Sequence, residues 1–86
     1  MRNEILSFLD GKITINPKIC NGKPTIRGTR ITVQTILEFL SAGESHKEIL
    51  HQYPSLKPDD IKACLTFATM LMSRNYVVKD RIECIN

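Results

Sequence analysis

Apolar residues recur with two different periods along this 86-residue chain. The run Ile13-Thr14-Ile15-Asn16 alternates apolar and polar residues, and this period of two predicts a short strand. Before it, Ile5, Leu6 and Leu9 are spaced to share one side of a helix. We therefore expect one or two helical turns between Met1 and Leu9, followed by the strand.

The segment from Gly22 to Ile31 mixes glycine, proline and basic residues, and it is predicted to form a β-hairpin. Gly22 and Gly28 permit backbone angles that are closed to other residues, while Pro24 biases its predecessor toward an extended conformation. The expected parts, in order, are an extended Ile19-Cys20, a strand at Thr25-Ile26, a turn near Arg27-Gly28-Thr29 and a return at Arg30-Ile31.

A helical period begins after the hairpin. Thr32 is placed to cap a helix that runs to about Ala42 and ends before Gly43. Its apolar stripe has the spacing i, i+3, i+4, i+7 and consists of Val33, Ile36, Leu37 and Leu40.

Two further helices follow at short intervals. Ser45 and Glu48 match a capping box that opens a short second helix. Pro58 suits the first position of a third helix, which is predicted to run to about Asn75. Its predicted apolar face consists of Ile61, Cys64, Leu65, Ala68, Leu71 and Met72.

The expected fold is mainly α and forms a single domain over residues 1–86. A tri-helical helix-turn-helix bundle (32–75) is preceded by a short N-terminal β-hairpin region (13–31) and followed by a tail (76–86).

Charge is unevenly distributed along the chain. Residues 1–31 hold six basic and two acidic residues, a net charge of +4, whereas the remaining 55 hold six basic and seven acidic ones, a net charge of −1. This asymmetry favours an anionic partner for the N-terminal third, and the alternative is a solvated basic surface.

Several classes of protein are not expected. No apolar run approaches the ~20 residues of a membrane span, and the N-terminus is too polar for a signal peptide, so a cytoplasmic protein without a membrane partner is predicted. Three cysteines without a C-x-x-C pair make neither a disulfide framework nor a zinc site. We find no nucleophile elbow, phosphate-binding loop or metal cluster, so neither an enzyme, a cofactor nor a small-molecule substrate is expected.

Nucleic-acid binding is the first function to consider, because the second helix of a helix-turn-helix pair enters the major groove. The outer face of the third helix offers Lys62, Thr66 and Arg74, but Asp59 and Asp60 at its start repel phosphate. The hairpin is therefore the better candidate for phosphate contacts, through Arg27, Arg30 and Lys23. The alternative is that these residues only build the turn.

The tail is the second candidate for function. Its apolar and basic residues are suited to a protein partner and include Tyr76, Val77, Val78, Lys79, Arg81 and Ile82. The alternative is that the tail folds back onto its own core.

Residues 13–68 resemble the family catalogued as domain of unknown function 433. The resemblance rests on an ordered series of motifs: Gly22-Lys23-Pro24, Ile26, Gly28-Thr29-Arg30-Ile31, Val33, Gly43, Ser45, Glu48-Ile49, Tyr53-Pro54, Leu56, Asp60-Ile61, Leu65 and Ala68. Lys57 departs from the Ser or Thr cap that is common in the family. Because lysine cannot accept hydrogen bonds from helix amides, Asp59 and Asp60 are expected to compensate.

The resemblance implies a homeodomain-like fold and a role as a VapB-like antitoxin encoded beside a PIN-like ribonuclease. Such antitoxins form homodimers, bind operator DNA and block the toxin with a terminal extension. The expected function is therefore a DNA-binding antitoxin, and the alternative is a protein-interaction module without a direct DNA role.

Overall fold

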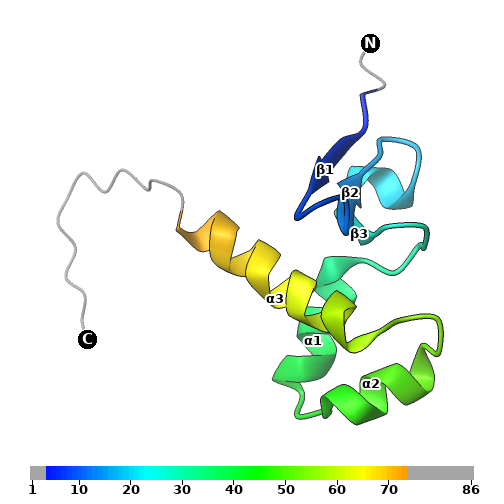
Figure 1. Cartoon of the computed structure of the whole chain (residues 1–86), viewed down its shortest axis with the longest axis vertical. Helices are drawn as coiled ribbons and strands as arrows, with labels where there is room; N and C mark the ends of the chain where they lie inside the picture. The colour runs from blue at the N-terminus through cyan, green and yellow to red at the C-terminus, as the bar shows by residue number, and fades with distance from the viewer. Residues whose placement is uncertain (1–3, 74–86) are drawn as a thin grey trace, which may run out of the picture.

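The structure is a computed structural model that describes residues 4–73. Within these residues the chain forms a small sheet followed by three helices (Figure 1). The elements are, in order, β1 (Leu6–Phe8), β2 (Ile13–Ile15), β3 (Thr25–Ile26), α1 (Val33–Ser41), α2 (His46–Gln52) and α3 (Pro58–Met72).

The sheet is antiparallel, with the strand order β1-β2-β3. Leu6 lies opposite Ile15 and Phe8 opposite Ile13, while Ile13 also lies opposite Ile26. This register turns Phe8, Ile13 and Ile26 toward the same face, because residues that lie directly opposite each other share a face of the sheet. Ile13 and Ile26 are buried there, and Phe8 is half-buried.

The predicted helical turns at Met1 to Leu9 are wrong for the described residues, because β1 occupies this stretch. The four apolar positions among residues 5–9 fit a helix or a strand almost equally well. Pairing with β2 decides between them, because it satisfies the backbone groups of Leu6 and Phe8 along one side.

The expected fold class is also wrong. A three-stranded antiparallel sheet with three helices is an α+β fold, whereas a mainly α bundle with a two-stranded hairpin was expected. β3 pairs chiefly with β2, and the predicted return strand supplies only a bridge between Thr25 and Thr32 and a hydrogen bond from Ile26 N to Ile31 O (3.0 Å). Nor is Cys20 extended: it begins a 3₁₀ turn, Cys20–Gly22.

The helix starts are confirmed in detail. The Thr35 amide donates to Thr32 Oγ1 (3.0 Å), which makes Thr32 the cap of α1. At α2 the Ser45 amide donates to Glu48 Oε1 (2.6 Å), and the Glu48 amide donates to Ser45 Oγ (3.0 Å). Each side chain thus satisfies an amide that has no partner inside the helix.

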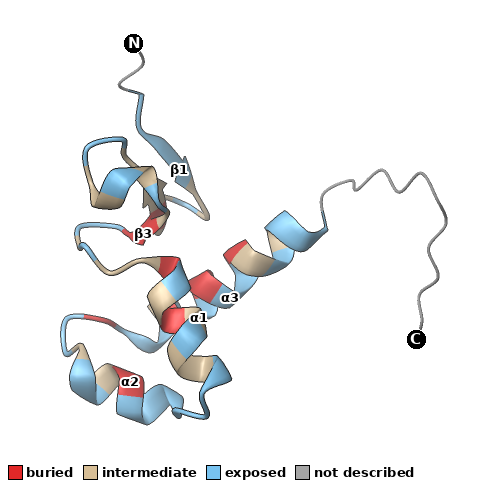
Figure 2. Ribbon diagram, turned by 180° about the vertical axis from the view of Figure 1, so that it is seen from behind, coloured by how far each residue is buried: buried red, intermediate tan, exposed pale blue. Residues whose placement is uncertain are grey.

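The core lies where the helices meet the sheet, and α3 crosses it (Figure 2). Ile36 of α1, Ile49 of α2 and Ile61 of α3 are each at most 1% exposed. The predicted apolar face of α3 needs correction, however. Leu65, Leu71 and Met72 are exposed, while the core takes Phe67, together with Ile61, Ala63 and Cys64.

Phe67 explains this change of face, because its ring contacts Phe8 of β1 edge-on at a centroid distance of 5.2 Å. The sheet therefore covers a side of α3 that a bundle of helices alone would leave to solvent. The apolar face predicted from the sequence assumed that α3 packs within a bundle of three helices, whereas β1 also packs against α3.

Candidate nucleic-acid interface

The exposed side of α3 carries polar residues along its middle, beside the exposed Leu65. Lys62, Thr66 and Thr69 lie about one helical turn apart, and all three are exposed. Thr69 donates to the carbonyl of Leu65 (2.9 Å), so its hydroxyl hydrogen is already used within the helix. Lys62 and Thr66 are therefore the donors that this face offers to a partner.

The turn between β1 and β2 lies against the N-terminal half of α3 and forms an open cavity of about 290 Å³ with it. The turn contributes a mixed set of side chains, and so does the helix. The lining residues are Leu9, Asp10 and Lys12 from the turn and Asp59, Lys62, Ala63 and Thr66 from α3.

An unusual backbone shapes this turn. Leu9 and Asp10 both have positive φ angles (55° and 57°), followed by Gly11 at 83°. The left-handed region costs an L-residue other than glycine roughly 1–2 kcal/mol. Hydrogen bonds from Gly11 N to Phe8 O and from Lys12 N to Leu9 O (both 3.1 Å) hold the turn in place. The conformation returns the chain to β2 so that Lys12 lines the same cavity as Lys62.

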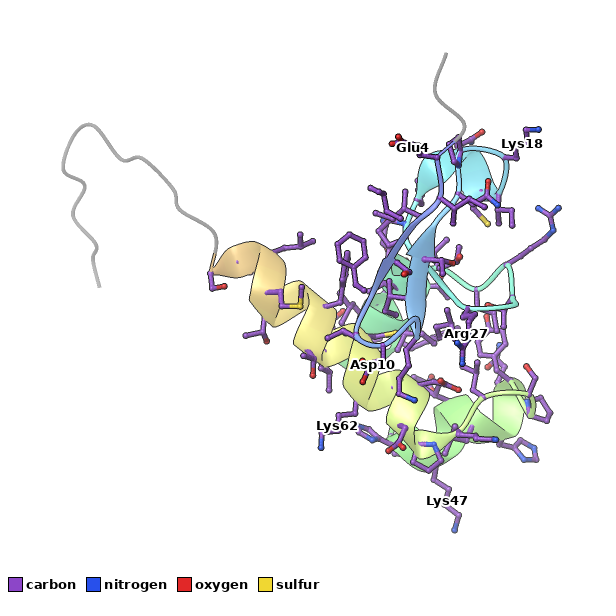
Figure 3. All side chains as sticks on the ribbon, turned by 45° about the horizontal axis from the view of Figure 1, so that its top comes forward. Glu4, Asp10, Lys18, Arg27, Lys47 and Lys62 are labelled. Carbon is purple, nitrogen blue, oxygen red and sulfur yellow. The ribbon has the colours of Figure 1, made fainter. Side chains whose placement is uncertain are left out.

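Arg27 lies next to this turn. Its amide donates to the carbonyl of Lys12 (2.9 Å), which extends the β2–β3 ladder by one residue. The guanidinium covers Gly11 so closely that a Cβ at Gly11 would lie 3.0 Å from Arg27 Nη1. Figure 3 shows Arg27, Asp10 and Lys62 around this junction of sheet and helix. The name turn–helix strip is used here for three cations: Lys12 and Lys62, which line the cavity, and Arg27, which covers the adjacent Gly11.

The remaining predicted DNA contacts lie elsewhere. Arg30 is exposed, and its carbonyl accepts a hydrogen bond from the Cys20 thiol (3.4 Å). Lys23 lines two hollows together with residues of α1, one of them an apolar groove that includes Leu37 and Phe67. The structure therefore brings Lys62 and Thr66 together at the cavity and places Arg27 next to the β1–β2 turn, whereas neither Arg30 nor Lys23 lines that cavity. Arg74 lies beyond the described residues.

The predicted turn at Arg27-Gly28-Thr29 is confirmed. Gly28 has a φ of 76°, Thr29 Oγ1 donates to the carbonyl of Ile26 (2.7 Å), and the Ile31 amide donates to Thr29 Oγ1 (3.0 Å). These contacts explain the glycine and the threonine as parts of the turn. These contacts do not involve the guanidinium groups of Arg27 and Arg30, which have no ion pair to any acid among residues 4–73.

The acidic residues at the start of α3 have a structural role as well as an electrostatic one. Asp60 Oδ2 accepts the amide of Lys57 (2.8 Å), which is one half of a capping box, while the Asp60 amide donates to the backbone carbonyl of Lys57 (2.8 Å). Asp59 instead lines the cavity, and with Asp10 it places negative charge beside Lys12 and Lys62.

Two ionisable groups outside the strip have shifted pKa values. The Ser45 amide and hydroxyl hold the pKa of Glu48 below its usual value because they stabilise the carboxylate. Burial, and secondarily the charge of Asp60, raises the pKa of Cys64 to about 12. Cys64 is therefore a neutral packing residue at physiological pH.

Lys12 is the member of the strip that the sequence did not single out. Its signal was the Asp10-Gly11 dipeptide between two apolar runs, which is a frequent hairpin turn. Interpreting residues 1–9 as helical hid that turn.

Two further features, a metal-binding cluster and a membrane-spanning helix, are not found among the described residues. Among residues 4–73, no cluster of three or more His, Cys, Asp or Glu side chains is arranged to hold a metal ion. Within the same part of the chain, no helix has the length and apolarity required to cross a bilayer.

Comparison with known proteins identifies the family. The model of the family described as protein of unknown function (DUF433) matches residues 13–68. The chain belongs to this family. The match covers β2 to most of α3, whereas β1 and the end of α3 lie outside it.

Two relatives are similar to this chain over comparable regions. The uncharacterized protein y4eO of Sinorhizobium fredii is 34% identical over 56 residues, which are 65% of this chain and 25% of that protein. A crystal structure of a DUF433 member protein from Anabaena variabilis has a TM-score of 0.67 and 36% sequence identity. That match covers 69% of this chain and 58% of the other, so the chain spans a quarter of one relative and just over half of the other.

Proposed function

We propose that this DUF433 protein is the antitoxin of a toxin–antitoxin pair. In this proposal it binds its own operator DNA as a homodimer and neutralises a PIN-like ribonuclease. The observation that carries the DNA-binding part is the turn–helix strip, where Arg27, Lys12 and Lys62 meet the exposed polar face of α3.

The strip has the composition and placement that phosphate contacts require. Its cations come from the β1–β2 turn (Lys12), from the residue that follows β3 (Arg27) and from α3 (Lys62), so they are held at separate points of the fold. Thr66 lies one turn beyond Lys62 on α3 and adds a hydroxyl. Contacts of this kind set the orientation of a protein on DNA, while base edges are read by the helix that enters the groove.

One observation favours a second function. Asp10 and Asp59 line the same cavity as Lys12 and Lys62, so both signs of charge meet there. Mixed charge suits a protein surface of complementary pattern better than a uniformly negative phosphate backbone. The second candidate is therefore a protein-interaction module that does not bind DNA.

A gel-shift titration against the DNA upstream of the gene separates the two candidates. Arg27→Ala combined with Lys62→Ala is expected to weaken binding, and each lost phosphate contact should reduce the slope of log K against log salt by about 1. Lys47→Ala is the matched control, because Lys47 is an exposed lysine on α2 that does not line the cavity between the β1–β2 turn and α3.

The outcomes are distinct. An unchanged salt slope in the double variant excludes the strip as the phosphate contact. Asp10→Asn and Asp59→Asn should strengthen DNA binding if the acids only oppose phosphate, and they should weaken capture of a protein partner if the second candidate is correct.

The toxin-neutralising part of the proposal concerns the tail. Tyr76, Val77, Val78 and Ile82 offer apolar contacts, and Lys79 or Arg81 would pair with the carboxylates of a ribonuclease site. These residues lie outside the described part of the chain. Co-expression with the neighbouring gene product tests this part: removing residues 76–86 should abolish rescue of growth, and rescue that persists would contradict it.

A further inference from the structure

Among residues 4–73, the two edges of the sheet differ in one important respect: one is covered and the other is open. On the outer side of β3, Thr25 forms a bridge with Thr32, and the Val33 amide donates to the carbonyl of Pro24 (2.9 Å). β1 is the opposite edge, and among the described residues only β2 pairs with it.

The hydrogen-bond directions show which groups of β1 face outward. The Arg27 amide donates to the carbonyl of Lys12, so the polar backbone groups of Lys12 point toward β3. Because these directions alternate along an antiparallel strand, the groups of Ile13 point toward β1 and bond its partner Phe8. The backbone N–H and C=O of Ser7 must then point away from the sheet.

The open edge lacks the features that normally prevent association. Native proteins protect edge strands with charges, prolines or bulges. Residues 5–9 contain none of the first two, and β1 pairs with β2 in an unbroken register. In addition, Ile5 is 58% exposed and Leu6 is 49% exposed.

We propose that β1 is the dimerisation edge of this protein and that its occupant is β1 of a second copy, paired antiparallel about a two-fold axis at Leu6. In this register Ile5 of one copy lies opposite Ser7 of the other. The backbone groups of both residues point away from β2, so they form hydrogen bonds between the two copies. The two Leu6 residues then form the closely spaced, non-hydrogen-bonded pair. The inference names the surface of the homodimer in the proposed function and rests on that homodimer.

Symmetry favours a second copy at this edge, and the charge distribution permits it. Residues 1–31 carry a net charge of +4, so two copies repel each other over most of the surface that these residues form. Residues 5–9 are an uncharged segment within it, and so they are where two copies can approach most closely. An antiparallel pair of identical strands is self-complementary, and a two-fold axis closes the assembly at two copies.

Light scattering coupled to size exclusion tests the inference without DNA. The full chain is expected to have twice its monomer mass of 9.8 kDa. Leu6→Lys should reduce the mass twofold, and so should Ser7→Pro, which removes an outward N–H but no β1–β2 hydrogen bond. Leu65→Lys is the matched control and should remain dimeric, because Leu65 is an exposed leucine (40%) on α3.

Cross-linking tests the register. With Cys20 and Cys84 changed to serine, Leu6→Cys should form a disulfide-linked dimer under mild oxidation, whereas Thr14→Cys on β2 should not. A monomeric wild type, or edge variants that remain dimeric, would overturn the inference. If the wild type dimerises through β1 but does not shift DNA, the DNA-binding part of the proposed function fails and the dimer edge stands.

Discussion

Replacing Phe67 by alanine should remove the aromatic contact through which the sheet packs against α3. The side chain is 2% exposed and contacts Phe8 of β1 at a ring-centroid distance of 5.2 Å. Truncating a buried phenylalanine to alanine costs about 3–5 kcal/mol, through lost transfer free energy and the cavity left behind. A chain of 86 residues has a total stability of roughly 4–13 kcal/mol at the usual value per residue. Phe67→Ala should therefore remove much of the free energy of unfolding.

Urea titration followed by circular dichroism measures this loss. Wild type and variants must be compared at one protein concentration, because the proposed dimerisation would add concentration-dependent stability. Phe67→Leu keeps a large apolar side chain and loses the ring contact, which is worth about 0.5–1.5 kcal/mol. A double-mutant cycle with Phe8→Leu should return a coupling free energy of the same size.

Leu65→Ala is the matched control on the same helix. Leu65 is 40% exposed, so this variant should cost less than about 1 kcal/mol. The order of the two effects is the decisive result. If Leu65→Ala destabilised the protein more than Phe67→Ala, the face of α3 predicted from helical periodicity would be correct, and the docking of β1 described here would be refuted.

The remaining predictions concern the two shifted pKa values. Burial raises the pKa of Cys64 to about 12, so its contribution to stability is fully present below the pKa of an unfolded thiol and is lost as the pH rises from there toward 12. In the alkaline range, the free energy of unfolding of Cys64→Ala should therefore fall less steeply with pH than that of wild type. Equal slopes of this free energy against pH would contradict the raised pKa of Cys64. The pKa of Glu48 is lowered by its hydrogen bonds from Ser45, so its contribution is present above the unfolded value and is lost as the pH falls through the folded value. The difference in melting temperature between wild type and Glu48→Gln should accordingly disappear in acid, and a difference independent of pH would exclude the ionised carboxylate as its source.

The starts of α1 and α2 could be predicted from the sequence alone, because capping is a local interaction. Thr32 and Ser45 each bond an amide three residues ahead, so no distant part of the chain is needed to place them. The short spacing between α2 and α3 and the family motifs of residues 13–68 could likewise be identified from the order of residues.

Tertiary structure decided what lies between these elements. Ile5, Leu6 and Leu9 fit a helix or a strand, and only pairing with β2 made this segment β1. That pairing then buried Phe67 in place of Leu65 and placed Lys12 beside both Arg27 and Lys62. The paired residues of β1 and β2 lie five to nine positions apart in the sequence, and the contacts of Phe67 and Lys12 join residues at least 15 positions apart. Periodicity reports only on neighbours along the chain, so it could not distinguish a helical bundle with a basic hairpin from a sheet whose first turn completes a basic strip.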